Sequence, residues 1–218
     1  MKKEGLLIEP EFDNINKYLE SGTRTQVTDV LKKLSEQIHG NTDGMLVRNI
    51  LVWIHENTIR LHDGSDPRKF KRTASEILLS GERTGCCDSS TLFAALARSK
   101  GIPTMQIITL SKKWGTAIDN GIKLPTSGHY FVASYLTDVV GNSKWILIDS
   151  DRTVRDTREV NFVGLDLQNR NIGDLYAFAY VKDYYDDLHI DSIKSMNDIQ
   201  LKAYSMCDRS DFSFELER

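Results

Sequence analysis

The stretch GERTGCCDSSTLFAALARSKGIP, residues 81–103, holds two of the chain's three cysteines side by side. Apolar side chains recur at helical spacing from Asp88 onward, and Gly101 followed by Pro103 ends the pattern. We therefore expect a helix that runs to Lys100 and carries the cysteine pair at its start. The unpaired N–H groups of a first helical turn favour negative charge, so a thiol placed there is favoured as the thiolate.

The order of patterns along the chain predicts an α+β fold. Helical patterns come first, and strand patterns then follow one another without helices between them, which is typical of an antiparallel sheet with helices against one side. Besides the helix in the quoted stretch, we expect helices at 25–40, 44–61, 73–81 and 190–206, and strands at 104–110, 129–136, 144–149 and 174–181. Residues 111–128 contain three glycines and a proline and are expected to form a long loop.

The composition is that of an ordinary soluble globular protein, with 40% hydrophobic and 27% charged residues among 218. The net charge of −3 gives no electrostatic attraction to nucleic acid or to an anionic membrane. The apolar run before Glu9 is too short for a signal peptide, and no run approaches the roughly 18 apolar residues of a membrane span. Three cysteines do not form a disulfide framework, so we expect free thiols in a cytoplasmic protein.

A histidine and an aspartate stand at the ends of two expected strands. His129 opens the strand HYFVASYL, and Asp149 closes the strand KWILID. If the two strands are neighbours, both side chains reach the same edge of the sheet. A neutral histidine can take the proton of a thiol and later give it to a leaving amine, and a carboxylate can hold that histidine in the right tautomer. The chain thus contains the groups for acyl transfer, although their spacing alone does not require them to meet.

Four elements in this order resemble the transglutaminase-like core of the papain-type cysteine-nucleophile superfamily. They are Gly85-Cys86-Cys87-Asp88 at the helix start, Arg98 with Gly101-Ile102-Pro103 at its end, His129 with Phe131, and the strand from Trp145 to Asp149. The resemblance covers roughly residues 73–151. It implies a nucleophile helix packed on an antiparallel sheet, with Cys86 as nucleophile, His129 as general base and acid, and Asp149 as the orienting carboxylate.

Two of these roles have competitors. Counting back from the end of the helix favours Cys86 as the nucleophile, whereas a Gly-x-Cys pattern that starts at Gly85 would select Cys87. We expect Cys86 to react and Cys87 to be a packing residue. Asp151 competes with Asp149 for the carboxylate role, and Asp149 is favoured because it ends an apolar run, whereas Asp151 suits a turn.

Other residues have less specific signals. Trp53, Trp114 and Cys87 are candidates for an oxyanion donor or a groove wall, with simple packing as the alternative for each. His55 and His62 lack a third ligand at zinc spacing, so we expect neither a metal nor any other cofactor. The basic run PRKFKR, residues 67–72, is interpreted as a solvated loop and helix start rather than a nucleic-acid site.

Together these features predict a thiol-dependent enzyme that acts on amide bonds of a peptide or protein substrate, with no nucleic-acid or membrane partner. We expect one domain over residues 1–218, with an N-terminal helical part (1–65), a catalytic core (66–182) and a C-terminal extension (183–218). Hydrolysis, as in a cysteine protease or amidase, is favoured because no feature indicates a site that excludes water while admitting a second amine. The alternatives are a cross-linking transglutaminase and a binding module without turnover. The oligomeric state does not follow from the sequence.

Overall fold

Helices and a curved antiparallel sheet make up the computed structural model, which describes residues 7–61, 64–122, 127–151, 163–165 and 169–207. Within these residues the main sheet has six strands in the order β6-β5-β4-β3-β8-β7, and each neighbouring pair is antiparallel. The strands are β3 (Thr104–Ser111), β4 (Tyr130–Thr137), β5 (Ser143–Ile148), β6 (Val163–Gly164), β7 (Asn171–Ile172) and β8 (Leu175–Val181). The short strands β1 (Ile59–Arg60) and β2 (Glu82–Arg83) pair in parallel as a separate sheet. The predicted α+β class is confirmed.

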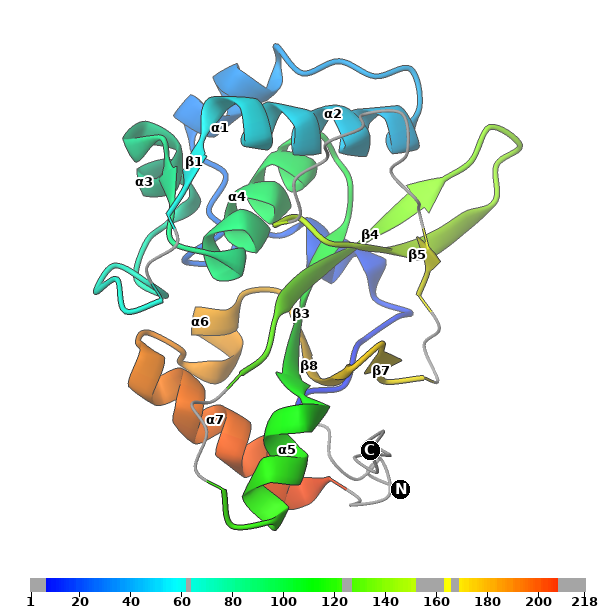
Figure 1. The fold of residues 1–218 in the computed structure, drawn as a ribbon. Helices are drawn as coiled ribbons and strands as arrows, with labels where there is room; N and C mark the ends of the chain where they lie inside the picture. The colour runs from blue at the N-terminus through cyan, green and yellow to red at the C-terminus, as the bar shows by residue number, and fades with distance from the viewer. Residues whose placement is uncertain (1–6, 62–63, 123–126, 152–162, 166–168, 208–218) are drawn as a thin grey trace.

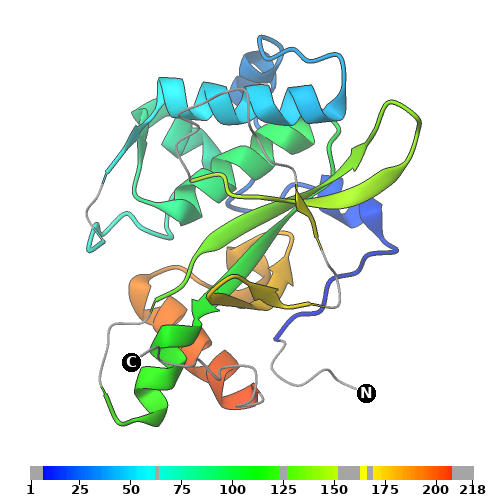
Figure 2. The ribbon, with the colours of Figure 1, turned by 45° about the vertical axis from the view of Figure 1, so that its right-hand side comes forward.

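The helices lie on one face of the main sheet, in two groups (Figure 1, Figure 2). The first group is α1 (Asp29–Ser35), α2 (Asp43–Asn57), α3 (Ala74–Ser80) and the central helix α4 (Cys86–Ser99); the second is α5 (Lys112–Asp119), α6 (Tyr184–Leu188) and α7 (Ile193–Met206). On β4, Val132 packs with the first group and Tyr130 with the second. Phe131 points to the opposite face, where it packs with Tyr18 of the 3-10 helix Ile15–Leu19. Alternate residues of this strand therefore pack on opposite faces of the sheet, as the pleat requires.

Local signals set the ends of α3 where the sequence predicted them. Thr73 caps the first turn, and Glu76 returns the contact to the backbone of Thr73, so the two form a capping box. Gly81 ends the helix in the left-handed conformation, with a φ of 65° that disfavours residues with a Cβ. This end leads directly into β2 and then into α4, so it fixes where the cysteine pair begins.

The expected loop at 111–128 is wrong for residues 112–119, which form α5. The glycine at its centre lowers intrinsic helix propensity, and the sequence pattern therefore indicated a loop. Ser111 caps the helix through the N–H of Trp114, and the ring of Trp114 packs edge-on against Tyr204 of α7 at 5.4 Å. Tertiary packing thus stabilises a helix that the local sequence does not favour.

Several other boundaries also differ from the expected ones. The helix expected at 25–40 is shorter, because the side chain of Thr28 caps α1 and the helix ends after Ser35. The helix expected at 44–61 ends at Asn57, and the residues after Thr58 form β1 instead. The hairpin of β4 and β5 has the expected pairing, and the last helix lies within the expected range. Such shifts of a few residues are the usual error of boundaries taken from sequence patterns.

The buried Arg98 ties three parts of the fold together. Its guanidinium donates to the carbonyl oxygens of Tyr18, Thr104 and Lys182 over 2.6–3.1 Å, and it also donates to the hydroxyl of Thr25 at 2.6 Å. Burial lowers the pKa of Arg98 to about 10, so it remains charged at neutral pH. These acceptors belong to the N-terminal segment, the start of β3 and the end of β8, so this arginine holds the end of α4 in place.

We expect Arg98→Met to lower the free energy of unfolding by about 3 kcal/mol, because several buried acceptors lose a charged donor. Urea denaturation measures the change. Arg68→Met is the matched control, since the side chain of Arg68 is 42% exposed and water can replace it beside its partners. The control should cost about 1 kcal/mol or less. Equal losses in the two variants would contradict the structural role given to Arg98.

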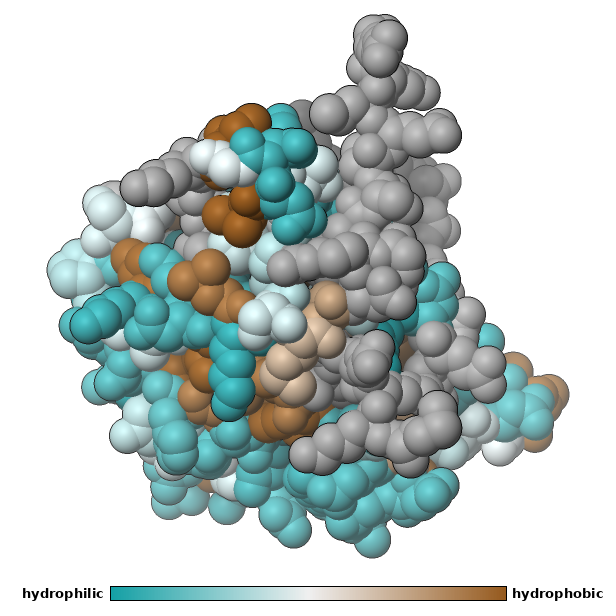
Figure 3. Space-filling model, turned by 90° about the horizontal axis from the view of Figure 1, so that it is seen from below, coloured by the Kyte–Doolittle hydropathy of each residue, from teal (hydrophilic) through white to brown (hydrophobic). Residues whose placement is uncertain are grey.

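The end of the molecule formed by α5 and α7 shows apolar areas among hydrophilic ones (Figure 3). On α7, Ile193, Leu201 and Met206 are exposed, whereas Tyr204 on its inner side is buried. In the part of the chain that the structure describes, no helix has the length and apolar character needed to cross a membrane.

Candidate functional site

Cys86 is the first residue of α4 and is partly exposed. The residue before it, Gly85, has a φ of 145° and a ψ of −162°, a conformation that is nearly restricted to glycine. This glycine turns the chain sharply from β2 into the helix. The thiol of Cys86 therefore lies at the N-terminal end of a fourteen-residue helix, whose first N–H groups have no partner within the helix.

Cys87 points the other way, into the core. It is fully buried and packs in a cluster with Phe70, Tyr130 and Tyr184. Burial, with the nearby negative charges of Asp88 and Cys86, raises the pKa of the Cys87 thiol well above its ordinary value. Cys87 is therefore a neutral thiol that fills space, and of the two neighbouring sulfurs only that of Cys86 is accessible.

His129 is held at the start of β4 by contacts with β3. Its backbone N–H donates to the hydroxyl of Thr109 at 3.0 Å, and its carbonyl oxygen accepts from the N–H of Thr109 at 3.1 Å. A Cβ on the preceding Gly128 would lie only 2.1 Å from the carbonyl oxygen of Thr109, so only glycine permits this close approach. The ring of Phe131 packs edge-on against the imidazole at 4.6 Å and restricts its rotation.

The structure brings Cys86, His129 and Asp149 together. Nε2 of His129 lies 2.8 Å from Oδ1 of Asp149, which directly follows β5. The side chain of Cys86 lies close enough to the same imidazole to raise its pKa. Because Asp149 occupies Nε2, the nitrogen left for the sulfur is Nδ1. Neighbouring strands and the helix end therefore supply the three side chains that the sequence singled out.

The imidazole of His129 holds its proton strongly. Its burial alone would lower the pKa, but the hydrogen bonds to Asp149 and Cys86 and the charges of both groups outweigh this effect. The result is a pKa raised to about 10 from an ordinary value of 6.5. At neutral pH His129 is therefore an imidazolium, placed between a sulfur and a carboxylate.

We expect His129 to titrate near pH 10 in the folded protein and Asp149→Asn to move this midpoint down toward 6.5. The protonated ring also stabilises the fold, because its folded pKa exceeds the unfolded one. This contribution is complete below about pH 6.5 and is lost as the pH rises through 10. The imidazole proton resonances in NMR measure the midpoint, and spectra of His129→Gln assign them. A midpoint near 6.5 in the unmodified protein would contradict this electrostatic description.

The two tryptophans named from the sequence pack away from this contact. Trp53 of α2 packs against the helical cluster of α1 to α4. Trp114 of α5 is only 2% exposed and packs with α7, so it lies in a core rather than along a groove. Within the described residues, no three His, Cys, Asp or Glu side chains are grouped closely enough to hold a metal ion.

The second aspartate, Asp151, lies in a buried polar cluster with Arg60, Arg83 and Ser89. Arg60 donates to both carboxylate oxygens through Nε at 2.9 Å, and Arg83 contacts Oδ1 at 3.3 Å. The hydroxyl of Ser89 donates to the same oxygen at 2.8 Å. No sequence motif connects the members of this cluster, because they come from β1, β2, α4 and the segment after β5.

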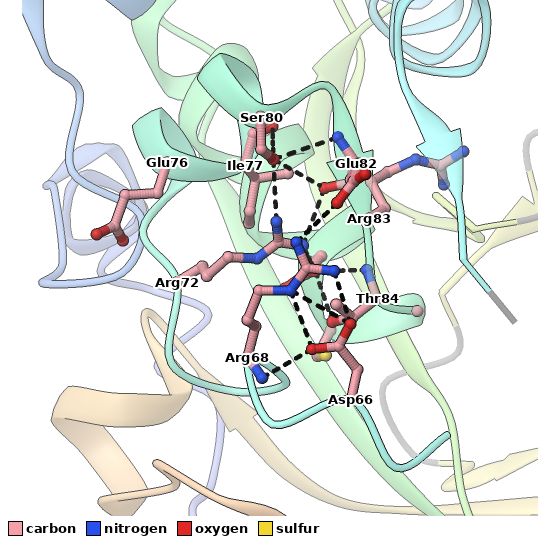
Figure 4. A network of polar contacts seen from close by, with 12 residues as sticks. Asp66, Arg68, Arg72, Glu76, Ile77, Ser80, Glu82, Arg83 and Thr84 are labelled. Carbon is pink, nitrogen blue, oxygen red and sulfur yellow. Dashed lines mark hydrogen bonds and ion pairs between the residues drawn. The ribbon is translucent and has the colours of Figure 1, made fainter. Parts of the chain in front are cut away.

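The basic run at 67–72 is folded back on acidic neighbours (Figure 4). Arg68 pairs with Asp66 and Glu82, both at 2.7 Å. Arg72 pairs with the buried carboxylate of Asp88 in the first turn of α4. Arg68 thus joins the loop to β2, and Arg72 joins it to the first turn of α4.

The model of the Transglutaminase-like superfamily matches residues 32–150, which is more than half of the chain. The chain belongs to this superfamily. The matched range contains Cys86, His129 and Asp149, and it ends one residue before Asp151.

The transglutaminase-like fold also recurs in a solved structure, "a Putative Cysteine Protease from Cytophaga hutchinsonii". The two chains superimpose with a TM-score of 0.52 at 19% sequence identity, over 83% of this chain and 53% of that chain. The likeness at this identity is one of fold, and this transglutaminase-like chain spans about half of its neighbour's length. No curated protein matches the sequence.

Proposed function

We propose that the protein is a thiol-dependent acyl-transfer enzyme that hydrolyses amide or peptide bonds. The nucleophile is Cys86, His129 is the proton donor, and Asp149 orients the imidazole. The observation that carries the proposal is the position of His129, whose Nε2 lies 2.8 Å from Asp149 while the Cys86 thiol lies beside the same ring. Membership of the transglutaminase-like superfamily supports it.

In the first half-reaction the sulfur of Cys86 attacks the carbonyl carbon of the substrate amide. The tetrahedral intermediate places negative charge on the carbonyl oxygen, next to the unpaired N–H groups at the start of α4. The raised pKa of His129 means that its proton is already on the ring at neutral pH. The imidazolium then gives this proton to the departing amine, and the C–N bond breaks to leave a thioester.

In the second half-reaction the neutral His129 takes a proton from water as the water oxygen attacks the thioester carbonyl. The C–S bond breaks, the carboxylic acid leaves, and the imidazolium beside the Cys86 sulfur is restored. Asp149 keeps Nε2 protonated in both steps, which leaves the other nitrogen to exchange protons at the reacting atoms. Every proton taken in one step is therefore returned in the other.

Exposure of the site supports water as the acceptor. Cys86 is partly exposed, and the side chains of His129 and Asp149 are 22% and 17% exposed. Water therefore has access to a thioester formed there. Transfer to a second amine would require that amine to compete with water at side chains that solvent reaches.

The experiment is a product analysis with a peptide mixture in water enriched in oxygen-18, in the presence of a labelled primary amine. We expect new carboxyl groups that carry oxygen-18 and little incorporation of the amine. Incorporation of the amine in excess over the heavy oxygen would replace hydrolysis with cross-linking. No product of either kind, with the protein folded, would favour a binding module and overturn the enzyme proposal.

A further inference from the structure

The buried cluster around Asp151 lies next to the candidate catalytic groups, since the backbone of Asp151 contacts Asp149. We propose that Asp151 is a positioning residue. It holds the carboxylate of Asp149 in a fixed position relative to the start of α4, so that His129 stays between Asp149 and Cys86. This inference rests on the proposed function. Asp149 contacts the imidazole directly, whereas Asp151, two residues later, acts on the imidazole only through Asp149 and α4.

The first link is a backbone contact. The N–H of Asp151 donates to Oδ1 of Asp149 at 3.1 Å, and this same oxygen accepts from Nε2 of His129 at 2.8 Å. Oδ1 therefore has two donors, one from the ring and one from the chain of the next turn. The backbone donor fixes the oxygen only if the segment that carries it is itself fixed.

The second link anchors that segment to the nucleophile helix. The Asp151 carboxylate is 5% exposed and accepts the hydroxyl of Ser89, which lies three residues after Cys86 and so one turn along α4. Ser89 in turn contacts the carbonyl oxygen of Gly85 and the guanidinium of Arg83. The end of β5 is thus bonded to the same helical turn that presents the sulfur.

The third link concerns charge. Arg60 lies on the exposed side of the cluster, with 36% of its side chain accessible. Cys86 and Asp149 lie close enough to interact with it electrostatically. Asp151 binds this guanidinium through both of its oxygens. Without the carboxylate of Asp151, Arg60 would be released to pair with Asp149 and to compete with His129 for it. Asp151 therefore keeps this cation away from the carboxylate that the imidazole needs.

The test is the NMR titration of His129 in Asp151→Asn. Among the described residues, the titratable groups that act on the imidazole are Cys86 on α4 and Asp149 after β5, and the ring of Phe131 on β4 packs against it. We expect the midpoint in the folded variant to fall by about one pH unit or more, because the hydrogen bond to Asp149 is no longer held in place. A lower stability alone would not move the midpoint of the folded state.

Two further variants separate positioning from charge and from general damage. Ser89→Ala changes no charge but removes one anchor of Asp151, and we expect a smaller fall in the same direction, about half a pH unit. Asp66→Asn is the matched control, because Asp66 is also a nearly buried carboxylate paired with an arginine, but it does not contact Asp149. The titration midpoint of His129 in this control should equal that of the unmodified protein.

Midpoints in Asp151→Asn and Ser89→Ala that both equal that of the unmodified protein would overturn the positioning role. If Asp151→Asn does not fold, the result for Ser89→Ala decides alone. A fall in Asp151→Asn with none in Ser89→Ala would reduce the effect to loss of charge and would also overturn it. The proposed function fails by a different result, the absence of any turnover that depends on Cys86, and the titration can be read in either case.

Discussion

Replacing Cys86 with Ala is expected to lower the turnover of amide substrates by about 10⁴-fold or more, while the fold remains intact. In the proposed reaction the Cys86 sulfur forms the thioester, and the neighbouring thiol of Cys87 is fully buried. Cys86 is partly exposed and lies at the edge of the apolar cluster, so its removal should cost little stability. Product release from a peptide substrate and thermal unfolding measure the two quantities separately.

Cys87→Ala is the matched control for this prediction. Cys87 is buried among aromatic rings, so the variant should lose roughly 1 kcal/mol of stability and keep most of its activity. The two variants are therefore expected to have opposite profiles, one inactive and stable, the other active and slightly destabilised. An inactive Cys87→Ala variant beside an active Cys86→Ala variant would show that the nucleophile was assigned to the wrong cysteine.

Replacing His129 with Ala is expected to lower turnover by about 10³-fold, because in the proposed reaction the departing amine would lose its proton donor. This loss should not add to that of Cys86→Ala, because in the proposed reaction the two residues act as one unit. The double variant measures this non-additivity.

His39→Ala serves as the control for the histidine prediction. His39 is exposed on the segment between α1 and α2 and does not contact the site, so its removal should leave turnover unchanged. If His129→Ala retained activity within tenfold of the unmodified protein, the imidazole could not be the proton donor.

The site residues that the sequence predicted are those that local patterns place at the ends of elements. The glycine before Cys86, the helical spacing after it and the glycine-proline end together defined α4. His129 and Asp149 stood at the ends of two strong strand patterns, and the structure pairs those strands as neighbours. Their contact was a conditional inference from the sequence, because it depends on the register of the hairpin.

What the sequence did not predict depends on contacts between distant segments. The helix α5 forms because Trp114 packs on α7, about ninety residues away in the chain, and its own glycine opposes it. The sequence favours Asp149 over Asp151 as the orienting carboxylate, because it shows only the positions of the two residues at one strand end. The two arginines and Ser89 that contact Asp151 come from three other elements, and nothing in the spacing of these residues shows that they meet.

The most direct measurement is the rate at which iodoacetamide labels each cysteine at pH 6, followed by peptide mass spectrometry. An ordinary thiol, with a pKa of about 8.5, is almost fully protonated at that pH and reacts slowly. We predict rapid labelling of Cys86, little labelling of Cys87, and a much slower reaction of Cys86 in His129→Ala. A Cys86 that reacts at the rate of an ordinary thiol, with no dependence on His129, would contradict the central claim that these two side chains form a reactive pair.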